Sequence, residues 1–105
     1  MLRIYPVVLE VLKQLQPALQ CIEARDRDLA RQLRRASASI ALNLAEGMYS
    51  RGRNRSARYH TALGSARETL SCLEVAVVFR YMREDAQLCD QLNRVVGTLV
   101  RLVRP

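Results

Sequence analysis

The chain has 105 residues and a net charge of +7, and half of its residues are apolar. This length predicts one domain spanning residues 1–105, with enough buried surface for a single hydrophobic core. Glycine and proline are too few for a protein of many short strands, and no apolar run reaches the ~20 residues of a membrane span, so we expect a helical domain with no membrane partner. The first residues do not form a signal-peptide pattern, so we expect a cytoplasmic protein.

The first predicted helix spans about residues 5–22. Apolar residues recur every three or four positions from Val8 to Ile22, which is typical of a helix with one buried face. Pro6 fits the first turn, where a missing N–H costs nothing. Pro17 lies inside the range, and we expect it to kink the helix because it removes a hydrogen-bond donor.

The second predicted helix spans about residues 27–49, with Asp26 as its N-cap. Its apolar face runs from Leu29 to Leu44. Asn43 lies beside this face and is expected to bond to a neighbouring helix or to the next turn, because a buried amide needs partners. Gly47 fits a left-handed C-cap, with a short continuation of the helix through Met48 and Tyr49 as the alternative.

The third predicted helix spans about residues 55–82, with Asn54 as its N-cap. It carries one apolar stripe for the core and a second stripe that includes Val75, Phe79 and Met82. A helix of a monomeric bundle needs only one buried stripe. We therefore expect Val75, Phe79 and Met82 to form an interface between subunits, although a merely apolar surface remains the alternative.

The fourth predicted helix spans about residues 86–103 and begins after Asp85, a suitable cap. Four helices joined by short turns predict an all-α, antiparallel up-down-up-down four-helix bundle.

No catalytic or metal-binding pattern is found in the sequence. His60 is the single histidine and has no acid or cysteine at helical spacing. Cys21, Cys72 and Cys89 are odd in number and far apart, which predicts reduced thiols buried as small apolar side chains. We therefore expect no enzymatic activity, no cofactor and no metal ion.

The strongest functional signal is the basic segment 48–58, which carries four arginines and no acid. Two of them fall in the first turn of the predicted third helix, where the helix dipole disfavours cations. Cations at such a position are explained if a phosphate lies between them and the helix N–H groups. The candidate nucleic-acid-binding residues are Arg51, Arg53, Arg55 and Arg58. The alternative is a solvated basic loop.

Other residues could extend this site. Tyr49 and Tyr59 flank the basic segment and could stack on bases. Arg34 and Arg35, on the second predicted helix, are further candidates for nucleic-acid binding. The alternative for this pair is an ion pair with a carboxylate of the bundle, either Glu46 or Glu68.

The segment from Gln32 to Gly47 (QLRRASASIALNLAEG) resembles the signature of the four-helix bundle family encoded in 23S rRNA intervening sequences. The family pattern continues with a basic turn and A-x-G-S-x-x-E. Ala62, Gly64, Ser65 and Glu68 match this second part. Three departures are Ala41, where many members have proline, His60-Thr61 in place of a more apolar pair, and the absence of the longer basic tail of some related accessory proteins.

This family is similar to the accessory variability proteins of diversity-generating retroelements. The resemblance implies a cytoplasmic, non-enzymatic homo-oligomer, a homopentamer, whose partners are RNA or DNA and a reverse transcriptase. The alternative function is a protein–protein interaction scaffold that does not bind nucleic acid.

Overall fold

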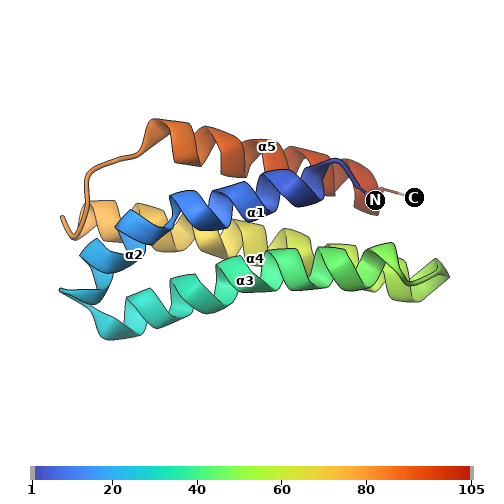
Figure 1. Cartoon of the computed structure of the whole chain (residues 1–105), viewed down its shortest axis with the longest axis horizontal. Coiled ribbons are helices and arrows are strands. Elements are labelled where there is room, and N and C mark those ends of the chain that lie inside the picture. The colour runs from blue at the N-terminus through green and yellow to red at the C-terminus, as the bar shows by residue number, and fades with distance from the viewer. Residues whose placement is uncertain (1, 105) are drawn as a thin grey trace.

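The computed structural model describes residues 2–104, which form helices and connecting turns without any strand (Figure 1). The helices are α1 (Ile4–Gln14), α2 (Gln16–Glu23), α3 (Arg27–Met48), α4 (Gly52–Val78) and α5 (Ala86–Val103). α1 and α2 are two halves of one rod, so the molecule has four rods. The first rod packs against α3 and α5, and α4 packs against the same two neighbours. The predicted antiparallel four-helix bundle is confirmed.

The two ends of the bundle consist of different segments of the chain (Figure 1). Both chain ends and the α3–α4 turn lie together at the terminal end, which comprises residues 2–9, 43–60 and 97–104. The α2–α3 and α4–α5 connections lie at the opposite end, which comprises residues 18–31 and 76–90. This division follows from up-down-up-down topology.

The core is mainly aliphatic, because the chain has only one Phe and four Tyr, and Tyr59 is the aromatic side chain among its buried residues. Each rod contributes one stripe of large side chains that are almost completely buried. These include Val8, Leu15, Ile22, Leu33, Ile40, Leu44, Leu73, Leu88, Leu92 and Leu99. The three- and four-residue spacing that predicted the helices therefore also identifies the residues that hold them together.

Pro17 interrupts the first rod, as predicted. α1 ends at Gln14 and α2 begins at Gln16, with Pro17 in the first turn of α2. Proline has no N–H to continue the hydrogen-bond ladder of α1. The side-chain amide of Gln16 donates a hydrogen bond to the carbonyl of Leu12 at 2.9 Å, next to the interruption between α1 and α2.

Gly47 does not have the left-handed conformation that we predicted for it. It lies buried within α3, and Gly52 is the glycine with a positive φ among the described residues. A Cβ on Gly47 would lie 2.7 Å from Cδ1 of Tyr59 on α4. Glycine is therefore needed here because two helices approach closely, not because the chain turns.

α4 begins and ends earlier than predicted. It starts at Gly52, where φ is 57°, and the N-cap is Arg51, whose side chain makes no capping hydrogen bond. The prediction that Asn54 caps this helix is wrong, because Asn54 lies inside it.

α4 stops at Val78 rather than near 82 because Arg80 adopts a left-handed φ of 63°. The N–H of Arg80 donates to the carbonyl of Val77, and the N–H of Tyr81 donates to that of Ala76. This pair of bonds is the Schellman motif, which satisfies the last carbonyls of a helix.

The other boundaries lie within one residue of the predicted ones. Asp26 and Asp85 cap α3 and α5, accepting hydrogen bonds from the N–H groups of Leu29 at 3.0 Å and Leu88 at 3.1 Å. Both predicted caps are confirmed.

Candidate nucleic-acid interface

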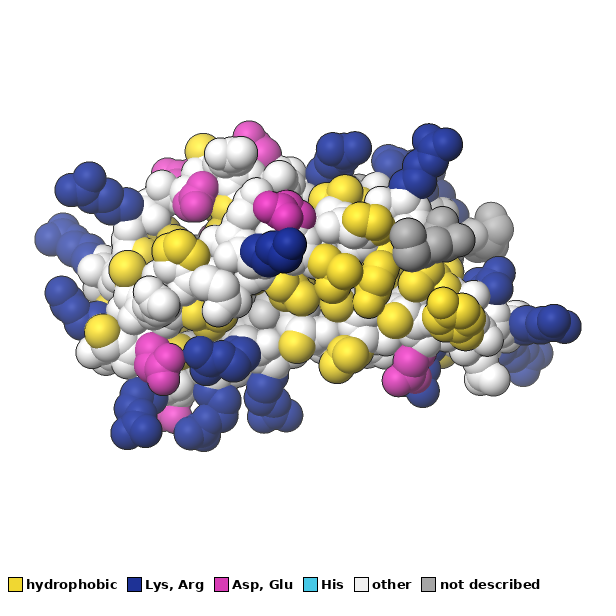
Figure 2. All heavy atoms as spheres, viewed as in Figure 1, with side chains coloured by type: hydrophobic (Ala, Val, Ile, Leu, Met, Phe, Trp, Pro, Cys, Tyr) yellow, Lys and Arg dark blue, Asp and Glu magenta, His cyan; other side chains and the backbone are white. Residues whose placement is uncertain are grey.

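Charge is distributed unevenly between the two ends of the bundle. The terminal end holds seven arginines and a single carboxylate, Glu46, whereas the opposite end holds five arginines and six carboxylates. In Figure 2 the acidic side chains of the visible face accordingly lie mostly away from the terminal end. The arginines of the terminal end are Arg3, Arg51, Arg53, Arg55, Arg58, Arg101 and Arg104. The excess positive charge of the protein is thus concentrated where the predicted basic segment lies.

Arg51 and Arg53 lie at the tip of this end, on the α3–α4 turn and the first turn of α4. Both are exposed, and neither forms an ion pair or a side-chain hydrogen bond with another residue of the 2–104 segment. The first turn of α4 contains no acid. The guanidinium groups and the helix N–H groups therefore face solvent without a local anion, which suits an incoming phosphate.

Arg55 is held in place by the preceding helix. Its Nε donates to the carbonyl of Gly47 at 3.2 Å, so part of its guanidinium group closes the α3–α4 turn. The remaining N–H groups can still bind a ligand, because a guanidinium has five donors.

Arg58 is already paired within the chain. Its Nη2 lies 2.9 Å from a carboxylate oxygen of Glu46, and its Nη1 donates to Oδ1 of Asn43 at 3.4 Å. The expectation that Asn43 bonds to a neighbouring helix is thereby confirmed. Of the four arginines of the basic segment, Arg58 has the smallest capacity to bind a phosphate, because Glu46 already neutralises it.

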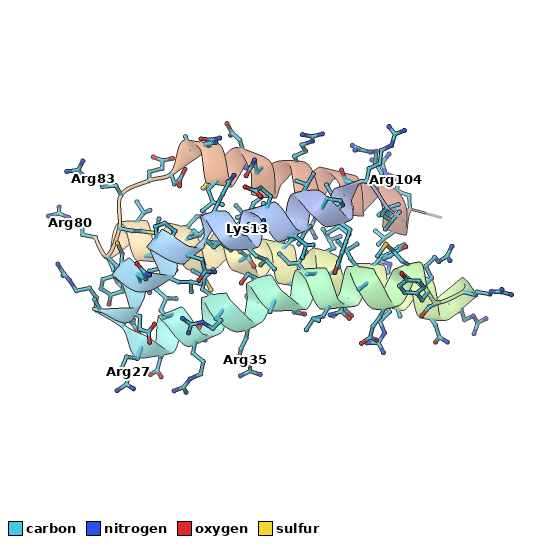
Figure 3. All side chains as sticks on the ribbon, in the orientation of Figure 1. Lys13, Arg27, Arg35, Arg80, Arg83 and Arg104 are labelled. Atoms are coloured by element: carbon cyan, nitrogen blue, oxygen red, sulfur yellow. The ribbon has the colours of Figure 1, made fainter. Side chains whose placement is uncertain are left out.

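Arg34 and Arg35 do not extend the basic turn. They precede Met48 by about 20 Å of helix, at a rise of about 1.5 Å per residue. Arg34 lies 3.2 Å from Glu23, not from Glu46 or Glu68, so the partners proposed for it are wrong. Arg35 lines a polar groove with Glu68 at the α3–α4 seam and points away from the bundle (Figure 3), with no ion pair to a described residue.

Arg104 joins the site, although we did not predict it from the sequence. It lines a groove of about 390 Å³ together with Gly52, Arg55 and Tyr59, between the start of α4 and the end of α5. Figure 3 shows its side chain at the terminal end. The predicted topology could have indicated this position, because an up-down-up-down bundle places the end of its last helix beside the connection between its second and third helices.

The two tyrosines beside the basic segment differ in exposure. Tyr49 has 90% of its surface exposed, whereas Tyr59 has 5% exposed and packs over Gly47. Tyr59 therefore cannot stack on a base, and Tyr49 remains available for that role.

The predicted subunit interface lies near the C-terminal end of α4. Val75 and Phe79 are exposed to 40% and 58%, and Val78 between them reaches 76%. Met82 is partly buried against the core. The structure thus leaves a contiguous set of apolar side chains uncovered at the place where we expected subunit contacts.

Other features bear on catalysis and on membranes. Within residues 2–104, no group of three or more metal-ligating side chains comes together, and no helix has the length and apolarity to cross a membrane. His60 is exposed. Cys72 is buried and Cys89 partly buried, but Cys21 is exposed, so the prediction of buried thiols is wrong for Cys21.

Comparisons with other proteins agree with this architecture. A family described as 23S rRNA-intervening sequence protein matches residues 3–101. A similar solved structure is that of an S23 ribosomal protein family member from Bacteroides thetaiotaomicron, with a TM-score of 0.86 and 17% sequence identity, covering 97% of this chain and 99% of that one. At this identity the likeness shows the fold alone. No curated protein matches the chain.

Proposed function

Because the chain belongs to the family of 23S rRNA-intervening sequence proteins, we propose that it is a non-enzymatic homo-oligomer that binds nucleic acid through its terminal end. The observation that carries the proposal is the positive charge of this end, which holds seven arginines and one carboxylate. Arginine binds phosphate through a planar, bidentate fork, so such a group suits a polyanion.

Within this end, Arg51, Arg53 and Arg104 are the principal phosphate contacts, because each is exposed and, unlike Arg55 and Arg58, has no side-chain hydrogen bond or ion pair with another described residue. Arg55 supports them from the groove that it shares with Arg104. Tyr49 offers an exposed ring for stacking on an unpaired base. Contacts of this kind recognise the backbone and ring faces, so the binding is independent of sequence.

A single copy with about three phosphate contacts binds weakly and is sensitive to salt. Several copies in one assembly raise the effective concentration of each arginine turn for the same strand. We propose that Val75 and Phe79, the exposed members of the predicted set, pack between neighbouring subunits of a ring, with five subunits as in the accessory variability proteins. Met82 is left out of this contact because it is partly buried against the core. A reverse transcriptase is the protein partner that this similarity suggests.

The test is fluorescence anisotropy with labelled single-stranded RNA, single-stranded DNA and duplex DNA at 50 to 300 mM salt. We expect binding with a steep salt dependence, since each phosphate contact on duplex DNA contributes a log–log slope of about −0.9. The triple variant R51A/R53A/R104A should lose binding by at least tenfold.

The matched control is R27A/R31A/R83A, which removes the same charge from the opposite end. It should bind as the wild type does. Equal losses in both variants would mean that total charge matters and the terminal end does not. No binding at 50 mM salt would instead favour the interaction scaffold, whose supporting observation is the uncovered apolar surface of α4.

A further inference from the structure

An apolar groove lies between the C-terminal part of α4 and the start of α5, at the opposite end of the bundle from the arginine turn. Its volume is about 250 Å³, and Val77, Val78 and Met82 line it. Val78 is 76% exposed. Burying such an exposed aliphatic side chain against a partner is favourable, by about 25 cal/mol per Å² of apolar surface.

Carboxylates surround this groove. Glu74 on α4 and Glu84 and Asp85 before α5 line it, and none of the three forms an ion pair with another residue of the described chain. One carboxylate oxygen of Asp85 accepts a hydrogen bond from the N–H of Leu88 and so caps α5. Glu74 and Glu84 are therefore free to receive cations.

The nearby arginines do not neutralise this rim. Arg80 and Arg83 belong to the same connection, but their side chains extend outward from the end of the bundle (Figure 3) and do not line the groove. Cys89 does line the groove, and the pKa of its thiol responds to the charges around it. The pKa of the Cys89 thiol is raised, mainly by burial and then by the negative charges of Glu84, Asp85, Glu74 and Asp90.

We propose that this groove is the docking site for a short basic segment of another protein. An apolar side chain of that segment would fill the groove, and its flanking Arg or Lys residues would form ion pairs with Glu74 and Glu84. Charge complementarity supports this occupant, because the groove is negative on a chain of net charge +7. Its volume lies below the ~300 Å³ at which small-molecule pockets begin, so it suits one or two side chains.

A second copy of this chain fits less well. The part of the chain that most resembles such a ligand is Tyr49, which is exposed and followed by Arg51 and Arg53. However, this turn is three residues long and is held between α3 and α4. It cannot lie along the groove as an extended segment does. Self-association through the groove is therefore one of the outcomes that the test separates.

The test uses the full chain and three synthetic peptides, RRLFRR, RRSSRR and EELFEE, each capped at both termini. Binding is followed by chemical-shift changes in amide spectra of the labelled protein. RRLFRR should bind, with the largest changes in residues 73–89. The other two should bind at least tenfold more weakly, because each lacks either the apolar anchor or the cations.

Two variants locate the site. E74Q/E84Q removes the proposed cation contacts and keeps Asp85, the cap of α5, so it should weaken RRLFRR binding about tenfold. V78S should weaken it as well, and its exposed position allows the chain to fold. The control E10Q/E68Q removes the same charge from other exposed positions and should bind the peptide normally.

Three outcomes would overturn the proposal. These are equal binding of RRSSRR and RRLFRR, equal weakening by E74Q/E84Q and E10Q/E68Q, or a change of oligomeric state in V78S with peptide binding intact. The last result would assign the groove to a contact between copies. Because Glu74 and Glu84 lie far from the arginine turn, nucleic-acid binding should be unchanged in E74Q/E84Q, so the two proposals fail separately.

Discussion

At the scale of single residues, the glycines at positions 47 and 64 lie inside long helices but differ in what surrounds them. Gly47 is buried against the ring of Tyr59, whereas Gly64, on α4, is exposed with open space where a Cβ would lie. Helix propensity alone would favour alanine at both positions by up to about 1 kcal/mol. The packing of α4 on α3 therefore decides which substitution is tolerated.

Gly47→Ala is expected to destabilise the protein by about 1–3 kcal/mol, because the new methyl group forces the buried Tyr59 ring to move. Gly64→Ala should stabilise it by about 0.5–1 kcal/mol. Urea unfolding followed by circular dichroism measures both. If Gly47→Ala proved as stable as Gly64→Ala, the close approach of the two helices at this point would be wrong.

At the scale of elements, the end of α4 contains a local conflict. Arg80 occupies the left-handed position of the Schellman motif, which glycine usually fills, and its φ is 63°. A side chain in this conformation costs roughly 1–2 kcal/mol. The hydrogen bonds of the motif and the packing of the next residue hold it there. Tyr81 contacts Phe79, with ring centroids 5.6 Å apart, and its hydroxyl donates to Asp26 at 3.3 Å.

Arg80→Gly is therefore expected to raise the free energy of unfolding by about 0.5–1 kcal/mol, since relief of the backbone strain exceeds the added entropy of the unfolded chain. Arg83→Gly removes the same charge from the same connection at a position without a positive φ. It should give no gain. Thermal unfolding of the two variants, compared in one buffer, distinguishes strain relief from a charge effect.

The sequence predicts the helices better than their ends, for a physical reason. Spacing of apolar residues from Val8 to Ile22 or from Leu88 to Leu102 is a local property that burial enforces over many turns. Gly47 was misread because its role depends on Tyr59, which the sequence does not place beside it. The early start of α4 was missed because Gly52, not the better capping residue Asn54, sets it.

At the scale of the whole molecule, the candidate site was predicted only in part. The turn arginines are close in sequence and could be recognised as a cluster. Arg104 is not, and only the packing of α5 beside α4 brings it to Arg55. Conversely, Arg58 looked free in the sequence and lies 2.9 Å from Glu46 in the fold. Charge density in a sequence therefore overestimates the number of cations available to a ligand.

The assembly itself can be tested on the exposed apolar side chains. The double variant V75S/F79S should shift the protein to a smaller species in light scattering after gel filtration, because it removes apolar surface from the proposed subunit interface. Leu42 on α3 is 64% exposed and supplies the control L42S, which should leave the mass unchanged. An unchanged mass in V75S/F79S would place the subunit contacts elsewhere.

The position of the chain ends has a practical consequence for such experiments. Leu2 lines a groove with Met48 and Arg55, and Arg104 lines another with Gly52 and Arg55, so both residues lie beside the α3–α4 turn. An affinity tag or fusion partner attached to either terminus will crowd the arginines, and a polyhistidine tag will add its own titrating charge. Insertion of a label into the α4–α5 connection keeps that surface clear but encroaches on the acid-rimmed groove. Tag-free protein is therefore the appropriate material for measuring both interactions.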